Sequence, residues 1–293
     1  MEPGALLDLD LVIRDAWEMP PLPASIGRLA VLVTDPTSDL GDIVEVVEFD
    51  QALTAKLLRA ANSAASASAR EITTVAEAVQ RLGGGMVLSF ATAHGTRDQL
   101  QQPLDGYQLD EGELWRHSVA SALVAQLAPR TLKMSVPSVT FTVSLLHDIG
   151  KLLLNRFLDP EMRQLLHRAH EEGGIDWVKA ESEILGINHA ELGGMMVQHW
   201  DLPTLIIRGI HYHHNPDDFA AAVGMHKPEE QTVCDIAHVA NVIANRVDRD
   251  PSLDVTSSVQ PGAWDRLKLD EGKIDDLTEA VAEQFEAVLA RYE

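Results

Sequence analysis

Residues 144–151 read SLLHDIGK and lie within a stretch, 138–157, that we predict to be helical. Neighbouring residues on a regular helix do not face the same side. His147 and Asp148 therefore reach a single ion only where the helix ends or bends, and Gly150 permits a close approach at such a point. A neutral imidazole beside a hard carboxylate oxygen suits Zn, Mn, Fe or Mg better than a metal that prefers thiolates.

On both sides of this string, apolar residues recur at spacings of three and four, and strand-like alternation is scarce. Aromatic residues make up only 5% of the chain. The pattern predicts an all-α protein. The segment 248–262 (DRDPSLDVTSSVQPG) is predicted to be a loop. The last predicted helix, 273–292, carries an apolar stripe that either closes the core or meets a partner helix.

The composition excludes several classes of protein. The chain has 293 residues, ample for a buried core, and a formal net charge of −22, which repels phosphate backbones and anionic lipid heads. We therefore expect neither nucleic-acid binding nor membrane binding. The single cysteine, Cys234, excludes an internal disulfide framework. The acidic N-terminus and the absence of a long apolar run lead us to expect a cytoplasmic location.

Most of the twelve histidines fall between His147 and His238, and histidine is the commonest neutral metal ligand. His117 lies on a predicted helix, 113–128. His189 follows Asn188, an N-cap candidate with Glu191 three positions later, which predicts a capping box. Further candidates lie close together in 207–216 (IRGIHYHHNP) and at one face of the helix 230–247: His211, His213, His214, His238 and Asn241.

Seven motifs, in this order, resemble the HDOD (HD-related output domain) family: MPPLPAS (19–25), ALTAKLLRAANSA (52–64), AEAVQRLG (76–83), LWRHS (114–118), LLHDIGK (145–151), INHAELGGMMVQHWDLP (187–203) and IRGIHYHHNP (207–216). The resemblance covers about residues 18–216. It implies an HD-domain/PDEase-like helical bundle with an N-terminal helical subdomain. The polar stretch 97–112 is the best candidate boundary, so we predict parts at 18–105 (N-terminal helices), 106–216 (HD-like bundle) and 217–293 (C-terminal helical extension).

The resemblance also implies a metal site, because the HD superfamily consists of metal-dependent phosphohydrolases. By their match to the superfamily's pattern, six residues are metal-ligand candidates: His117, His147, Asp148, His189, His213 and His214. The divalent metal would be Fe, Mn, Zn, Mg or Ni. Asp148 and Lys151 are the candidate catalytic residues, with Lys151 at the position often placed near the substrate phosphate.

Two positions depart from the catalytic pattern of the superfamily. Asn241 stands where the last metal-binding Asp is expected, which removes one anion from the site. HHNPDDF (213–219) replaces the Gly-Tyr-Pro loop of the cyclic-dinucleotide phosphodiesterase branch, so that substrate is not implied.

Three functions follow from these observations. The first is a bacterial signal-transduction module, akin to the output of two-component-like regulation, that binds a protein partner or a small phosphorylated ligand and retains part of the metal cleft without robust catalysis. The second is a metal-dependent phosphohydrolase acting on a nucleotide or another phosphoester. The third is a module whose metal ion is structural or sensory. The missing anion at Asn241 favours the first.

Overall fold

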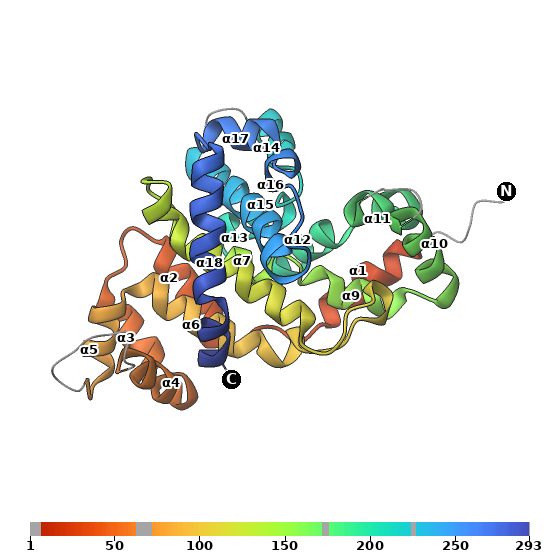
Figure 1. Cartoon of the computed structure of the whole chain (residues 1–293). Helices are drawn as coiled ribbons and strands as arrows, with labels where there is room; N and C mark the ends of the chain where they lie inside the picture. The colour runs from red at the N-terminus through yellow and green to blue at the C-terminus, as the bar shows by residue number, and fades with distance from the viewer. Residues whose placement is uncertain (1–6, 63–71, 172–175, 224–226, 293) are drawn as a thin grey trace.

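The computed structural model describes residues 7–62, 72–171, 176–223 and 227–292. In these residues helices are the only extended regular elements, which confirms the all-α prediction (Figure 1). Within them, no helix is both long enough and apolar enough to cross a membrane.

Several of the N-terminal helices begin at polar caps. Asp39 and Asp50 each accept hydrogen bonds from backbone N–H groups of the helix that follows, and Thr74 does the same for the next. Gly83 ends that helix at φ 76°, a conformation that glycine adopts without a Cβ clash. The helices are α1 (Leu9–Glu18), α2 (Ala24–Thr34), α3 (Leu40–Glu48), α4 (Gln51–Ala61), α5 (Val75–Leu82) and α6 (Gly84–Leu100).

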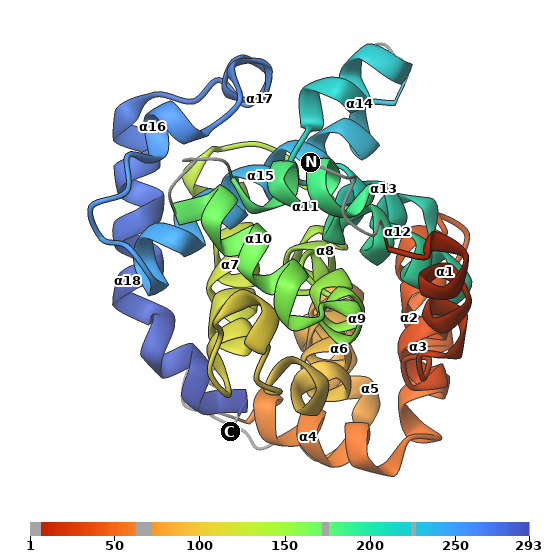
Figure 2. The same cartoon turned by 90° about the vertical axis from the view of Figure 1, so that its right-hand side faces the viewer.

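The central helices hold the candidate ligands. Figure 2 shows α8 and α9 in the middle of the molecule, with α7 on one side and α12 and α13 on the other. The elements are a 3-10 turn, η2 (Asp105–Tyr107), then α7 (Glu113–Thr131), α8 (Thr140–Leu146), α9 (Gly150–Phe157), α10 (Pro160–Glu171), α11 (Trp177–Leu185), α12 (His189–His199) and α13 (Thr204–His211). The stretch 138–157 is thus not one helix: it breaks between Leu146 and Gly150.

The C-terminal helices pack on α7. They are α14 (Pro216–Val223), α15 (Pro228–Asp248), α16 (Val255–Ser258), α17 (Pro261–Arg266) and α18 (Glu271–Tyr292). The prediction of a continuous loop at 248–262 is therefore wrong at α16, where the side chain of Asp254 caps a single helical turn.

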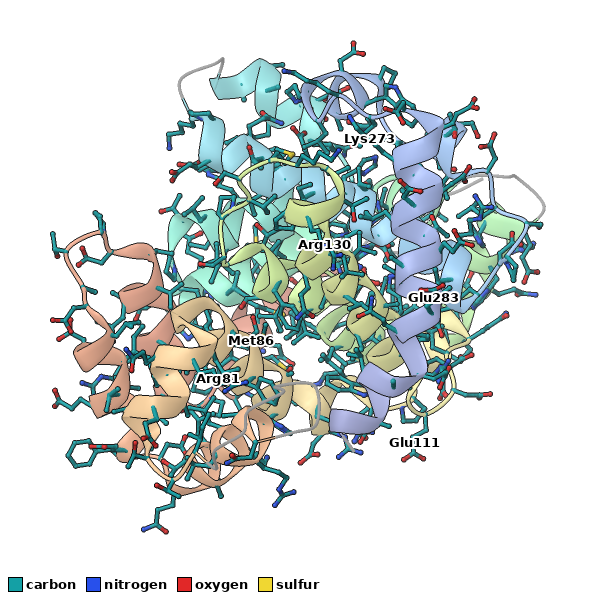
Figure 3. The ribbon with its side chains drawn as sticks, turned by 60° about the vertical axis from the view of Figure 1, so that its left-hand side comes forward. Arg81, Met86, Glu111, Arg130, Lys273 and Glu283 are labelled. Atoms are coloured by element: carbon teal, nitrogen blue, oxygen red, sulfur yellow. The ribbon has the colours of Figure 1, made fainter. Side chains whose placement is uncertain are left out.

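The last helix closes the core. In Figure 3, α18 descends past Lys273 and Glu283 alongside α7, which rises from near Glu111 to Arg130. Its apolar stripe is buried against α7, α15 and α16: Ile274, Leu277, Val281 and Phe285. Of the two roles predicted for this stripe, the structure shows the first.

Two hydrophobic clusters hold the helices together. The larger contains buried side chains from helices between α1 and α13, on both sides of residue 105, and also from α15 and α18. The smaller joins α7 to α15, α16, α17 and α18. The division at 105/106 stays a prediction. Because α7 contributes to both clusters, it connects the N-terminal helices, the central bundle and the C-terminal helices around the histidines.

Candidate metal centre

The break between α8 and α9 brings His147 and Asp148 to one centre. Ile149 N–H donates to the Leu146 carbonyl at 2.9 Å and Lys151 N–H donates to the Asp148 carbonyl at 3.0 Å, so the chain tightens into i→i+3 turns. The change in pitch lets two sequence neighbours point at the same place. Sequence reasoning required such a bend but did not locate it.

Gly150 allows α9 to touch α12 at this break. A Cβ at this position would lie 2.0 Å from the His189 carbonyl oxygen and 2.7 Å from the Gly193 backbone nitrogen. Both are backbone atoms, so no side chain can move aside to make room. The absence of a side chain at Gly150 therefore sets the distance between Asp148 and the start of α12.

One group of ligand atoms, here called the first half-site, consists of His117 Nε2, His147 Nε2 and Asp148 Oδ2. His117 Nε2 lies 3.2 Å from His147 Nε2 and 3.7 Å from Asp148 Oδ2, and His147 Nε2 lies 3.4 Å from Asp148 Oδ2. All three side chains are at most 1% exposed. The first half-site is sealed from solvent.

The second half-site consists of His189 Nε2, His213 Nε2, His214 Nε2 and Asp148 Oδ1. His189 Nε2 is 3.1 Å from Asp148 Oδ1 and 3.0 Å from His214 Nε2, and His213 Nε2 is 3.9 Å from Asp148 Oδ1. His214 is only partly buried, so this half-site has one side towards solvent. The structure thus brings all six predicted ligands together, with Asp148 between the two groups.

Hydrogen bonds from Nδ1 to backbone carbonyls orient two of the ligand histidines. His147 Nδ1 lies 2.7 Å from the Ser144 carbonyl, and His213 Nδ1 lies 2.7 Å from the Ile210 carbonyl. Because a carbonyl only accepts, both Nδ1 atoms carry the proton and both Nε2 atoms of the neutral rings present lone pairs to the centre. Burial, and after it the charge of neighbouring histidines, lowers the pKa of His213 well below its ordinary value, which favours the neutral ring.

His189 is held by a carboxylate that sequence reasoning missed. Glu181, fully buried on α11, accepts from the His189 Nδ1–H at 2.7 Å, from the His189 backbone N–H at 2.8 Å and from the Tyr107 hydroxyl at 2.8 Å. Burial alone would lower the pKa of His189, but the Glu181 carboxylate reverses this and raises it. One signal was in the sequence: Glu181 follows Val178 by three residues and precedes Leu185 by four, which puts a carboxylate on the apolar face of its helix.

Asp148 has a cation of the chain itself as a partner. Lys151 Nζ donates to Asp148 Oδ2 at 2.7 Å, and its side chain is only 9% exposed. Burial would raise the pKa of Asp148, but Lys151 and His147 outweigh burial and hold that pKa well below the usual range. Asp148 is therefore ionised near neutral pH.

Asn241 on α15 lies where the resemblance placed the missing carboxylate. Its Oδ1 is 3.0 Å from His117 Nε2 and accepts a second bond from Asn245 Nδ2 at 3.3 Å. An amide oxygen accepts a hydrogen bond from His117 but adds no charge for a cation. α15 belongs to the predicted C-terminal extension, so the extension contributes directly to the centre.

The remaining histidine candidates have other roles. His238 Nδ1 donates to the His213 carbonyl at 2.8 Å and its Nε2 accepts from the Gln260 backbone N–H at 3.0 Å, so neither nitrogen is left for a metal. His211 lies beside the Tyr212 ring, outside both half-sites. His238 therefore supports the loop that carries His213.

The donor atoms fit a divalent cation. Among the described residues, Asp148 Oδ1 and His213 Nε2 are buried and lack a hydrogen-bond partner. An unpartnered buried acceptor costs about 1–3 kcal/mol, and a cation between these atoms and His189 would remove that cost. Imidazole nitrogens with one carboxylate oxygen suit Zn, Fe, Mn or Ni.

The comparisons with known proteins agree with this fold. The HDOD domain family matches residues 19–216, and the chain belongs to this family. An uncharacterized protein of Treponema pallidum (strain Nichols) is 27% identical over 199 residues, which cover 68% of this chain. The matched region spans only 38% of that protein.

Solved structures share the fold over nearly the whole chain. An HDOD domain protein of unknown function from Geobacter sulfurreducens has a TM-score of 0.69 at 22% identity and covers 97% of this chain and 98% of its own. A candidate signal transduction protein from Marinobacter aquaeolei VT8 has a TM-score of 0.70 at 23% identity, covering 97% and 64%. A candidate phosphohydrolase from Shewanella amazonensis SB2B has a TM-score of 0.66 at 25% identity, covering 96% of each chain. The helices after residue 216, which the HDOD family match does not cover, thus also have counterparts in these solved structures.

Proposed function

We propose that this chain is a bacterial signal-transduction module whose HD-type cleft binds a divalent metal ion and does not support robust phosphoester hydrolysis. One observation carries the proposal. Asn241 Oδ1, an uncharged atom, stands 3.0 Å from His117 Nε2 where a hydrolase of this superfamily would place a carboxylate. Loss of one anionic ligand weakens the hold on a hard cation and its power to activate water.

Lys151 supports the same proposal. In a hydrolase, this ammonium would offset the charge on the phosphoryl oxygens of a substrate. Here Nζ is tied to Asp148 Oδ2 at 2.7 Å and its side chain is 9% exposed. A substrate would have to compete with a buried carboxylate for this cation.

In this proposal the module receives its signal by binding another molecule. The proposal includes a cytoplasmic location and, as partner, another protein of the signalling pathway or a small phosphorylated ligand. The description of the Marinobacter aquaeolei relative as a candidate signal transduction protein is in line with it. The net charge of −22 keeps nucleic acid and anionic membranes out of the proposal.

A metal-dependent phosphohydrolase is the second candidate. All six ligand candidates converge, and the relative from Shewanella amazonensis SB2B is described as a candidate phosphohydrolase. A bound divalent ion would supply an activated water and polarise a phosphoryl oxygen. Asp148 would hold the ion, and Lys151 would need to leave Asp148 to meet the phosphate.

One experiment separates these functions. Protein purified without a His-tag is analysed for its metal content and then assayed with added Mn²⁺ against a panel of phosphodiesters and phosphomonoesters. Stoichiometric metal without turnover is the expected result. Turnover that disappears in His147→Ala would replace the proposal with the hydrolase, and absence of bound metal would refute the metal-binding part.

The third candidate, a purely structural ion, is tested on the same sample. Chelation that unfolds the protein at room temperature would establish it. A chelated protein that keeps its helical circular dichroism supports the signalling module instead.

A further inference from the structure

The two half-sites differ in whether their inward-facing atoms already have partners. In the first half-site every such atom is engaged: Asp148 Oδ2 accepts from Lys151 at 2.7 Å, and His117 Nε2 lies within hydrogen-bond distance of both Asn241 Oδ1 and His147 Nε2. Because His147 donates at Nδ1, its Nε2 accepts from the His117 Nε2–H. The Lys151 ammonium and one proton on His117 Nε2, shared between His147 Nε2 and Asn241 Oδ1, thus cover the inward-facing atoms of the first half-site, while His117 Nδ1 is buried without a partner.

The second half-site has acceptors with nothing to accept. Asp148 Oδ1 and His213 Nε2 are both buried and both lack a hydrogen bond among the described residues. His213 donates at Nδ1 to the Ile210 carbonyl, so its Nε2 offers only a lone pair. A cation between these two acceptors, which lie 3.9 Å apart, would satisfy both, whereas a proton on His189 Nε2, 3.1 Å from Asp148 Oδ1, would satisfy only that oxygen.

The charges around the centre also favour a metal ion in the second half-site. The carboxylate of Glu181 backs His189, and an anionic partner on the far nitrogen makes an imidazole a better metal ligand. His147 has only a carbonyl behind it, and His117 has the neutral Asn241 beside it. The anionic support therefore lies with the second half-site.

The number of ions follows from the buried charges. The centre holds two carboxylates, Asp148 and Glu181, and one ammonium, Lys151, all at least nine-tenths buried. Their charges sum to −1, so one divalent ion already takes the centre to +1. A second ion would add two more positive charges beside the Lys151 ammonium, with no anion at Asn241 to offset them.

We propose that the cleft holds a single divalent metal ion, in the second half-site, bound by His189, His213, His214 and Asp148 Oδ1, while the Lys151 ammonium occupies the place of a second ion at Asp148 Oδ2. The inference rests on the proposed function only in that the cleft binds metal. Access is through partly exposed His214. The sealed position between His117 and His147 is not used by metal.

Matched histidine substitutions test the assignment. Untagged wild-type protein is compared with His213→Gln and His117→Gln, each loaded with Zn²⁺ and with Co²⁺. We expect one metal per chain in the wild type and in His117→Gln. We expect His213→Gln to lose metal affinity by more than about 100-fold, beyond the usual cost of losing an outer hydrogen-bond partner. The Co²⁺ absorption band should be unchanged in His117→Gln and absent in His213→Gln.

A variant that gains a metal ion provides a control, because misfolding can explain lost metal binding but not added metal binding. The double variant Asn241→Asp/Lys151→Gln supplies the missing anion and frees Asp148 Oδ2, so its stoichiometry should rise from one metal to two. Far-UV circular dichroism of each variant checks that the helices persist.

The outcomes distinguish this inference from the proposed function. Two metals in the wild type, or metal loss in His117→Gln equal to that in His213→Gln, would overturn the inference and leave the signalling module standing. Phosphoesterase turnover with one metal would overturn the proposed function and leave the assignment intact. A wild type that binds no Zn²⁺ or Co²⁺ would overturn both.

Discussion

Substitution of Gly150 by alanine tests whether the contact between α9 and α12 sets the geometry of the centre. The added Cβ would meet the His189 carbonyl oxygen at 2.0 Å, the Gly193 nitrogen at 2.7 Å and the His189 carbonyl carbon at 2.9 Å. Side-chain carbons essentially never come closer than about 3 Å to such atoms, so the helices must separate by at least about 1 Å at this point.

The separation has an energetic cost and a geometric one. Forcing atoms into a packed core costs about 1–3 kcal/mol, and the upper end applies here because the obstacle is backbone. We therefore expect Gly150→Ala to lower the free energy of unfolding by about 3 kcal/mol, measured by urea denaturation. The shift also moves Asp148 away from His189 Nε2, now 3.1 Å from its Oδ1, so Zn²⁺ affinity should fall by at least about 10-fold in a chelator competition assay.

Gly27 provides the matched control. It lies inside α2, and a Cβ there would meet nothing within 4 Å. Gly27→Ala should raise the free energy of unfolding by about 0.5–1 kcal/mol through helix propensity alone and leave Zn²⁺ binding unchanged. Equal stability and equal Zn²⁺ affinity in Gly150→Ala and the wild type would show that the close approach does not position the ligands.

Three further predictions use other contacts of the structure. Glu181→Gln should lower Zn²⁺ affinity by about 10–100-fold in isothermal titration calorimetry. Tyr107→Phe removes only the hydroxyl bonded to Glu181 and should lower this affinity less. Equal effects of the two substitutions would contradict the role given to the carboxylate. Arg266→Met leaves the buried Asp235 without its two charged hydrogen bonds of 2.9 and 2.7 Å and should cost about 3–5 kcal/mol in urea denaturation, most of it recovered by adding Asp235→Asn. Burial, and after it Lys56 and two arginines, lowers the pKa of His94 to about 4. The unfolded chain therefore binds a proton at His94 near pH 6.5, whereas the folded chain binds it only near pH 4. Stability should therefore fall as the pH drops from 6.5 to 4, and His94→Gln should remove about 1–2 kcal/mol of that fall, discounted for the partial exposure of the ring; parallel pH profiles for the two proteins would contradict this.

Local patterns in the sequence predicted local structure well. The Asn188–Glu191 capping box forms in full and places His189 in the first turn of α12, as its spacing predicted. Gly83 ends α5 at a positive φ of 76°, a conformation that favours glycine, so the residue type is itself a local signal. These features depend on residues three or four apart, so a single sequence contains the information needed to predict them.

What the sequence did not reveal depends on contacts between distant residues. Glu181 reaches Tyr107 across 74 positions, and nothing local indicates that contact. The pairing of His117 with Asn241, 124 positions apart, was indicated by the family resemblance and not by local pattern. The bend at His147 is also not a property of its own segment, because the apolar stretch 138–157 suits one helix by periodicity. It is fixed by α12, which packs against Gly150 and leaves no room for a Cβ. Tertiary packing thus decided where the helix breaks and which atom of each histidine faces inward.

Asn241 explains how the buried first half-site is compatible with a stable fold without a metal ion of its own. A carboxylate at this position would lie within about 7 Å of Asp148, since each group contacts His117 Nε2, at 3.0 and 3.7 Å. At an effective dielectric constant of about 20, two such charges repel by roughly 2–3 kcal/mol, and burial adds a desolvation cost. The amide avoids both costs and still accepts the His117 proton. The residue that lacks a metal-binding carboxylate is therefore the same one that lets Lys151 and the His117 proton hold the first half-site together. The proposed loss of hydrolase chemistry is for this reason physically compatible with a retained cleft.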